Sequence, residues 1–100
     1  MNYFFHPEAE KELIEAVDYY EGIELGLGYD FALEVFSAIQ KSADFPDAWT
    51  PLKDKIRRSI LKRFPYGIIY SKERKGLFIL AIMNLHRRPN YWKDREKVKK

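Results

Sequence analysis

Apolar residues recur at helical spacing near the start of the chain, at positions i, i+4, i+7, i+8 and i+11. They are Ala9, Leu13, Ala16, Val17 and Tyr20. This spacing puts them on one face of a helix. Pro7 suits the first helical turn, so a helix is predicted from about residue 7 to about residue 21. Four acidic residues fall outside the apolar stripe and are expected on a solvated face: Glu8, Glu12, Glu15 and Asp18.

A second helix is predicted after a glycine-rich interruption. Gly22, Gly26 and Gly28 break the first pattern and indicate a turn between helices. A new apolar stripe then ends at Phe45 and Pro46, because a residue before proline avoids the helical region. The members of this stripe are Ala32, Val35, Phe36, Ile39 and Ala43. The two segments predict an antiparallel helical hairpin.

The remaining apolar segments, before the first helix and after the second, are typical of β-strands. An aromatic run at residues 3–5 predicts a first strand, and β-compatible segments follow at 56–64, 66–70 and 77–85. The last segment is apolar throughout, as expected of a central strand covered on both faces. After Pro89 the chain is expected to form a short tail or helix. The predicted fold is α+β, in the order β-αα-βββ, with the helical hairpin packed on a mainly antiparallel four-stranded sheet. We expect one domain spanning residues 1–100.

The composition of the chain excludes several kinds of site. The chain of 100 residues has no cysteine, which excludes a disulfide scaffold and thiolate zinc sites. Its two histidines, His6 and His86, show no metal-binding spacing, so neither a metal nor a cofactor is expected. The longest apolar run is far shorter than the roughly 20 residues of a membrane-spanning helix. We therefore expect a cytoplasmic protein with no membrane partner.

Charge is divided unevenly along the chain. Residues 1–50 hold eleven Asp and Glu against two Lys, a net charge of −9, whereas residues 51–100 hold sixteen Lys and Arg against four Asp and Glu, a net charge of +12. Arginine binds phosphates and carboxylates through its planar fork, and aromatic rings stack on bases or bury in a partner. The candidate binding residues are Arg57, Arg58, Arg63, His86, Arg87, Arg88, Tyr91, Trp92 and Arg95.

Several alternatives stay open at this point. Scattered lysines in a basic protein commonly form a solvated surface with no ligand. Clustered arginines beside aromatic residues favour a polyanionic or acidic partner, but charge alone does not distinguish nucleic acid from an acidic protein. Tyr91 and Trp92 follow a proline near the C-terminus, where burial in the core and exposure for binding are equally compatible with the pattern.

Seven sequence fragments, in this order, resemble the RelE/ParE toxin superfamily over about residues 3–95. They are Phe5-His6-Pro7-Glu8-Ala9, Tyr19-Tyr20-Glu21, Leu27-Gly28, Arg63-Phe64-Pro65-Tyr66, Ile68-Ile69-Tyr70, Ile79-Leu80-Ala81-Ile82 and the closing Arg87-x-Pro89-x-Tyr91-Trp92. The family's fold, a helical hairpin on an antiparallel sheet, agrees with the pattern analysis. The resemblance implies the toxin of a type II toxin–antitoxin or plasmid stabilisation system, held inactive by a cognate antitoxin protein.

The resemblance implies one of two cellular targets. Members similar to RelE cut messenger RNA on the ribosome, and members similar to ParE poison DNA gyrase. Two basic positions of the nuclease pattern are occupied here by Ile60 and Gly67, whereas Arg58, Arg87 and Tyr91 stand in compatible places. The leading hypothesis is therefore a toxin similar to ParE that acts by binding through a basic surface, without a catalytic centre. The alternatives are a metal-independent ribonuclease, with those last three residues as its catalytic set, and a non-toxic binding module.

Overall fold

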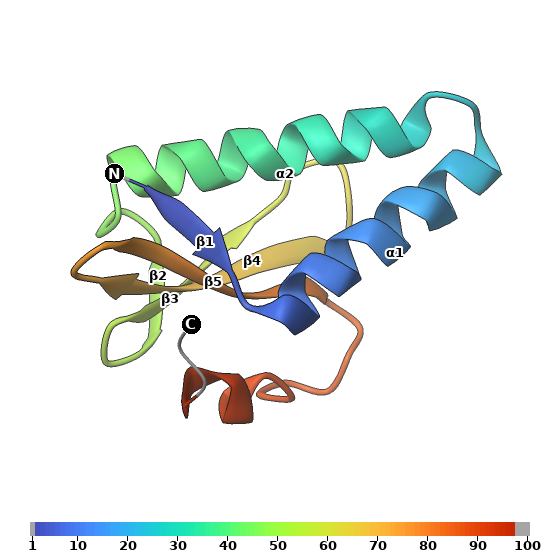
Figure 1. The fold of residues 1–100 in the computed structure, drawn as a ribbon. Coiled ribbons are helices and arrows are strands. Elements are labelled where there is room, and N and C mark those ends of the chain that lie inside the picture. Colours follow the sequence, from blue (N-terminus) through green and yellow to red (C-terminus); the bar gives the residue numbers. More distant parts are fainter. Residues whose placement is uncertain (1, 98–100) are drawn as a thin grey trace.

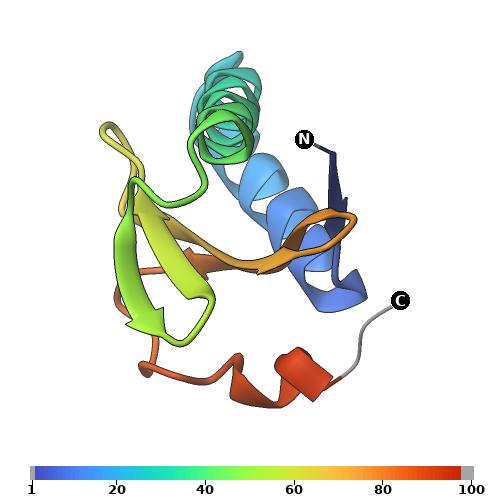
Figure 2. The same cartoon turned by 90° about the vertical axis from the view of Figure 1, so that its left-hand side faces the viewer.

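The computed structural model describes residues 2–97 and contains two long helices and a five-stranded sheet. The helices cover one face of the sheet, and the C-terminal segment lies against the other (Figure 1, Figure 2). The strand order is β1-β5-β4-β3-β2, in which β1 is parallel to β5 and all other neighbours are antiparallel. This arrangement confirms the predicted α+β fold with the order β-αα-βββ, and adds one strand to it.

Helix α1 spans Pro7–Ile23, close to the predicted bounds. His6 caps its N-terminus, because the His6 Nδ1 atom accepts a hydrogen bond of 3.0 Å from the Glu8 N–H. An acceptor nitrogen must be unprotonated, so this cap requires neutral imidazole. Burial, followed by the positive charge of Arg95, lowers the pKa of His6, while Glu8 and Glu12 act in the opposite direction. The lowered pKa favours the form that the cap needs.

Helix α2 spans Leu27–Asp44 and is joined to α1 by the predicted glycine turn. Gly26 has a φ of +89°, a conformation that glycine adopts at little cost. The Glu21 carboxylate accepts hydrogen bonds from the N–H groups of Gly26 and Gly28, at 2.8 and 2.9 Å. These bonds satisfy donors that the first turn of a helix leaves without partners, so they fix the entry into α2.

The sheet is built around two long strands. β4 spans Tyr66–Glu73 and β5 spans Gly76–Asn84, and β5 is buried along nearly its whole length, as its apolar run predicts. β1 spans Tyr3–Phe5 and pairs with the first part of β5. The expected strand at residues 56–64 is shorter in the structure, where β3 spans Ile56–Ile60.

The strand that the sequence did not predict is β2, at Thr50–Lys53. All four of its residues are exposed, and Leu52 is its one large apolar side chain. It lies at the edge of the sheet, where Pro51 is tolerated because an edge strand need not donate from every N–H. A short polar strand of this kind has no periodic hydrophobic pattern by which to detect it.

Two apolar clusters hold the layers together. Between the helices and the sheet, Phe31 meets Phe64 and Tyr66 at ring-centroid distances of 5.0 and 4.9 Å. On the other face of the sheet, Trp92 packs with residues of β3, β4 and β5 and is only 2% exposed. Trp92 is therefore a core residue that holds the C-terminal segment against the sheet. Of the two interpretations that the sequence left open for this candidate binding residue, the structure shows burial. The segment ends in a 3₁₀ turn, η1, at Lys93–Lys97.

Among the described residues, neither helix combines the length and the apolar character needed to cross a bilayer.

Candidate functional site

The C-terminal part of β5 has an open edge that α1 and the C-terminal segment close. β1 pairs with β5 only as far as Phe5 and Ile79. A register irregularity follows, after which the Leu80 C=O and the Ile82 N–H face away from β4. Glu12 accepts from the Ile82 N–H at 3.0 Å, and Arg95 Nη1 donates to the Leu80 oxygen at 3.0 Å. Side chains thus take the place of the missing neighbour strand.

Glu12 is the centre of this network. Its carboxylate accepts two hydrogen bonds from the Arg95 guanidinium, at 3.0 and 2.9 Å, and one from the Tyr91 hydroxyl at 2.8 Å. The Glu12 and Arg95 side chains are only 13% and 14% exposed. A buried carboxylate with this many donors is a structural tie between α1, β5 and the C-terminal segment.

The expectation that Glu12 lies on a solvated face was therefore wrong. Glu12 lies three residues after Ala9 and four before Ala16, both of which are buried. Helical spacing puts all three on the same face, so the carboxylate points at the sheet. Glu8 and Glu15, by contrast, are exposed as expected. Of the four acidic residues that were expected in solvent, Glu12 is the one that shares a face of the helix with the buried Ala9 and Ala16.

Tyr91 lies between two arginines. The Arg87 guanidinium carbon is 3.9 Å from the centre of the Tyr91 ring, and that of Arg95 is 4.9 Å away. Burial, followed by the hydrogen bond and the charge of Glu12, raises the pKa of Tyr91 well above its ordinary value. Burial acts to lower the pKa of Arg95, but the hydrogen bond and charge of Glu12 outweigh it and raise the pKa. At neutral pH the tyrosine is a proton donor to Glu12, and the arginine is a buried cation.

Three of the candidate binding residues lie in the turn after β5. His86, Arg87 and Arg88 are all exposed. Arg87 lies over Tyr91 and its Nη1 atom is 3.8 Å from a Glu12 oxygen, yet its side chain remains 53% exposed. The turn is held by the His86 N–H, which donates to the Asn84 side-chain oxygen at 2.9 Å. This turn therefore offers positive charge to solvent from a fixed backbone.

The three arginines of the first basic stretch point in different directions. Arg57 donates to the Trp49 carbonyl oxygen at 2.7 Å and is half-buried. Arg58 lies on the face away from the helices, beside Gly67, where a Cβ would lie 3.4 Å from its Cγ. Arg63 lies in the loop after β3, where its Nη2 atom is 3.6 Å from an Asp30 oxygen.

The nine predicted residues therefore do not form one surface. Trp92 is buried and Arg95 is largely buried, and both hold the C-terminal segment against the sheet. Arg57 holds the loop before β2. Tyr91 and Arg87 share the network around Glu12. The members with exposed cationic or imidazole groups are His86, Arg87, Arg88 and Arg63.

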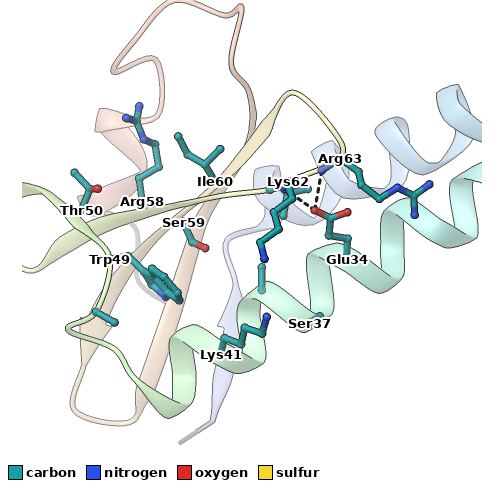
Figure 3. Close-up of a pocket in the computed structure, with 13 residues that line it drawn as sticks. Glu34, Ser37, Lys41, Trp49, Thr50, Arg58, Ser59, Ile60, Lys62 and Arg63 are labelled. Atoms are coloured by element: carbon teal, nitrogen blue, oxygen red, sulfur yellow. Dashed lines mark hydrogen bonds between the residues drawn. The ribbon is translucent and has the colours of Figure 1, made fainter.

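A cleft that the sequence analysis missed lies between α2 and β3 (Figure 3). It has a volume of about 450 Å³. The Trp49 indole and Lys41 of α2 line it, and the Lys62 side chain extends from the end of β3 toward α2. Glu34 closes one end, where its carboxylate accepts from the N–H groups of Lys62 and Arg63 at 2.6 and 3.1 Å. Residues from distant parts of the chain form this cleft, so no local sequence motif predicts it.

A second, smaller hollow of about 230 Å³ lies beside the Glu12 network. Glu12 and Glu15 line it together with Tyr66 and Arg87. Two carboxylates against one guanidinium make this hollow a poor site for a phosphate group, because like charges repel. Within residues 2–97, no cluster of three or more His, Cys, Asp or Glu side chains is placed to hold a metal ion.

Comparison with known protein families gives a match over most of the chain. The family described as "ParE toxin of type II toxin-antitoxin system, parDE" matches residues 3–91. No curated protein matches the chain. The family match covers both helices and all five strands, including the strand β2 that the sequence pattern did not reveal. The chain belongs to the ParE toxin family of type II toxin–antitoxin systems.

Proposed function

We propose that this protein inhibits growth by binding a cellular target such as DNA gyrase, and that a cognate antitoxin neutralises it. The match to the ParE toxin family over residues 3–91 is the observation that supports the proposal most directly. The action is by contact: the protein binds its target through exposed cationic groups and performs no covalent chemistry on it.

The exposed turn after β5 supports a binding role. Arg87 and Arg88 project from a short turn whose backbone is fixed by hydrogen bonds, including that from the Arg87 N–H to the Asn84 oxygen at 3.0 Å. Placing two guanidinium groups on a rigid support lowers the entropic cost of engaging a carboxylate or phosphate. We assign target contact to this turn.

The ribonuclease alternative has weaker support from the same geometry. A catalytic role for Tyr91 needs its hydroxyl to reach substrate, but the hydroxyl donates to Glu12 at 2.8 Å. The Arg87 guanidinium lies beside the same carboxylate, which offsets part of its charge. A phosphodiester approaching this hollow would meet Glu12 and Glu15. These contacts favour a structural role for Tyr91 over catalysis.

A supercoiling assay tests the proposed target. Purified protein at micromolar concentration is expected to block the ATP-dependent supercoiling of relaxed plasmid by DNA gyrase. The Arg87→Ala/Arg88→Ala variant should lose the inhibition, because it lacks both exposed guanidinium groups. A matched control, Arg74→Ala/Lys75→Ala, removes the same charge from the exposed turn between β4 and β5 and should inhibit as the wild type does.

Unchanged supercoiling in the presence of folded wild-type protein would contradict gyrase as the target. Primer-extension mapping of transcripts after induction separates the alternatives. Cleavage within codons would favour the ribonuclease, whereas intact transcripts together with inhibited gyrase would support the proposal.

A further inference from the structure

Tyr91 is fixed at three points where the C-terminal segment begins. Its hydroxyl donates to Glu12 at 2.8 Å, and the next residue, Trp92, is only 2% exposed. The residue before it, Asn90, has a φ of +69°, a left-handed conformation that asparagine adopts more readily than most residues. The Asn90 oxygen also accepts from the Lys93 N–H at 3.1 Å, which closes this turn. The turn, the buried indole and the hydroxyl bond together hold the Tyr91 ring in one place.

The Arg87 guanidinium lies over this fixed ring. Its carbon is 3.9 Å from the ring centre, closer than the 4.9 Å of Arg95. A cation within about 6 Å of an aromatic ring centre is attracted to the ring face. The Arg87 Nη1 atom is also 3.8 Å from a Glu12 oxygen, yet the side chain stays 53% exposed. The ring and the carboxylate therefore restrict the orientation of the guanidinium without withdrawing it from solvent.

Arg88, the next residue, offers an internal comparison. It is exposed like Arg87, but within residues 2–97 its side chain forms no ion pair and lies over no aromatic ring. A long side chain without such contacts keeps many rotamers, and it loses that freedom when it binds a partner. The two arginines of the turn therefore differ in how much order they have before a target arrives.

We propose that Tyr91 is a positioning residue for target binding, whose ring holds the Arg87 guanidinium in the orientation in which it meets an anionic group of the target. This inference rests on the proposed function, which assigns target contact to the turn after β5, and specifies which of the two arginines is ordered beforehand. Tyr91 acts through Arg87. Because its hydroxyl is engaged by Glu12, the face of the ring is the part that does this.

Two substitutions at Tyr91 separate the ring from the hydroxyl. Tyr91→Leu removes the aromatic face, so it is expected to raise about fivefold the protein concentration that half-inhibits supercoiling by DNA gyrase, because Arg87 must then be ordered on binding. Tyr91→Phe loses the same bond to Glu12 but keeps the ring, and should inhibit within about twofold of the wild type. Thermal unfolding curves establish that both variants are folded at the assay temperature. A Tyr91→Phe protein as weak as Tyr91→Leu would assign the effect to the hydroxyl bond and overturn the inference.

A double-mutant cycle tests whether Tyr91 acts through Arg87. Arg87→Ala is expected to raise the half-inhibitory concentration about tenfold, and adding Tyr91→Leu to it should raise that concentration by no more than about twofold further. In the matched Arg88→Ala background, Tyr91→Leu should keep its whole effect of about fivefold. An equally large effect of Tyr91→Leu without Arg87 would show that Tyr91 contacts the target itself or only supports the fold, and either result would overturn the inference.

A measurement on the free wild-type protein needs no target and no substitution. Protons above the face of an aromatic ring resonate upfield in NMR spectra, so the δ-methylene protons of Arg87 are expected upfield of those of Arg88. The difference should persist in Tyr91→Phe and disappear in Tyr91→Leu. Equal shifts for the two arginines of the wild type would show that Arg87 does not rest on the ring in solution, and would overturn the inference.

The outcomes separate this inference from the proposed function. If the folded wild-type protein leaves supercoiling unchanged, gyrase fails as the target and the inference fails with it, whatever the NMR shifts. If the wild type inhibits and Tyr91→Leu inhibits equally well, only the inference fails. Inhibition that needs the Tyr91 ring in the presence of Arg87, and not in its absence, would establish the positioning role.

Discussion

Glu12→Ala is expected to lower the free energy of unfolding by about 3 kcal/mol or more, since removing one partner of a buried ion pair leaves an uncompensated charge. Among residues 2–97, the Arg95 guanidinium would keep the Leu80 oxygen as its one hydrogen-bond acceptor. The Tyr91 hydroxyl and the Ile82 N–H would lose their acceptor. For a chain of 100 residues this cost corresponds to a fall in the thermal midpoint of roughly 12 °C or more. Thermal and urea unfolding followed by circular dichroism measure both quantities.

Two further variants test whether the loss of the Glu12 carboxylate itself causes the destabilisation. Glu15→Ala removes an exposed carboxylate from the same helix and should change the free energy of unfolding by no more than about 0.5 kcal/mol. Glu12→Gln keeps an acceptor for the Ile82 N–H but loses the charge that Arg95 needs, so its stability should fall between those of the wild type and Glu12→Ala. A Glu12→Ala protein as stable as Glu15→Ala would contradict the assignment of Glu12 as the tie between α1, β5 and the C-terminal segment.

Arg87→Ala/Arg88→Ala is expected to abolish growth inhibition while leaving the fold intact. Both side chains are exposed, and exposed charges contribute little to stability. Arg87 also lies over the Tyr91 ring, but Arg95 continues to hold the Glu12 carboxylate when Arg87 is removed. Colony counts after induction, beside a thermal unfolding curve of the purified variant, report activity and stability separately.

The charge-matched variant Arg74→Ala/Lys75→Ala gives that experiment its control. It lowers the net charge by the same amount at an exposed turn remote in sequence from His86 to Arg88, and should remain fully inhibitory. Equal loss of inhibition in both double variants would assign the effect to overall charge. Full inhibition by Arg87→Ala/Arg88→Ala at normal expression would remove the turn after β5 from the working surface.

Periodic segments were predictable from the sequence. The stripe containing Ala9, Leu13 and Ala16 fixed the buried face of α1, and the apolar run of β5 indicated a strand covered on both sides. These elements form where apolar side chains are buried away from water. The spacing of apolar residues within each segment is enough to show this. β2 was not predicted because all four of its residues are exposed, so the segment around Pro51 has no pattern of buried apolar residues.

The site was less predictable because it depends on pairings between distant segments. Glu12 and Arg95 are 83 positions apart. They meet at the edge of β5 that β1 leaves open, where each also bonds a backbone group of that strand. Neither residue's neighbours in the sequence reveal this contact. Trp92 was compatible with burial or exposure until the C-terminal segment was seen to fold back on the sheet. The cleft beside Trp49 is likewise formed only when α2 and β3 come together.

The proposal that this protein is a toxin restrained by an antitoxin is tested by growth after induction in a host that lacks the neighbouring reading frame. We predict that the wild-type protein alone arrests growth, and that co-expression of the neighbouring frame's product restores growth. Normal growth with the wild-type protein present and folded in the cells would contradict the account and favour a non-toxic binding module.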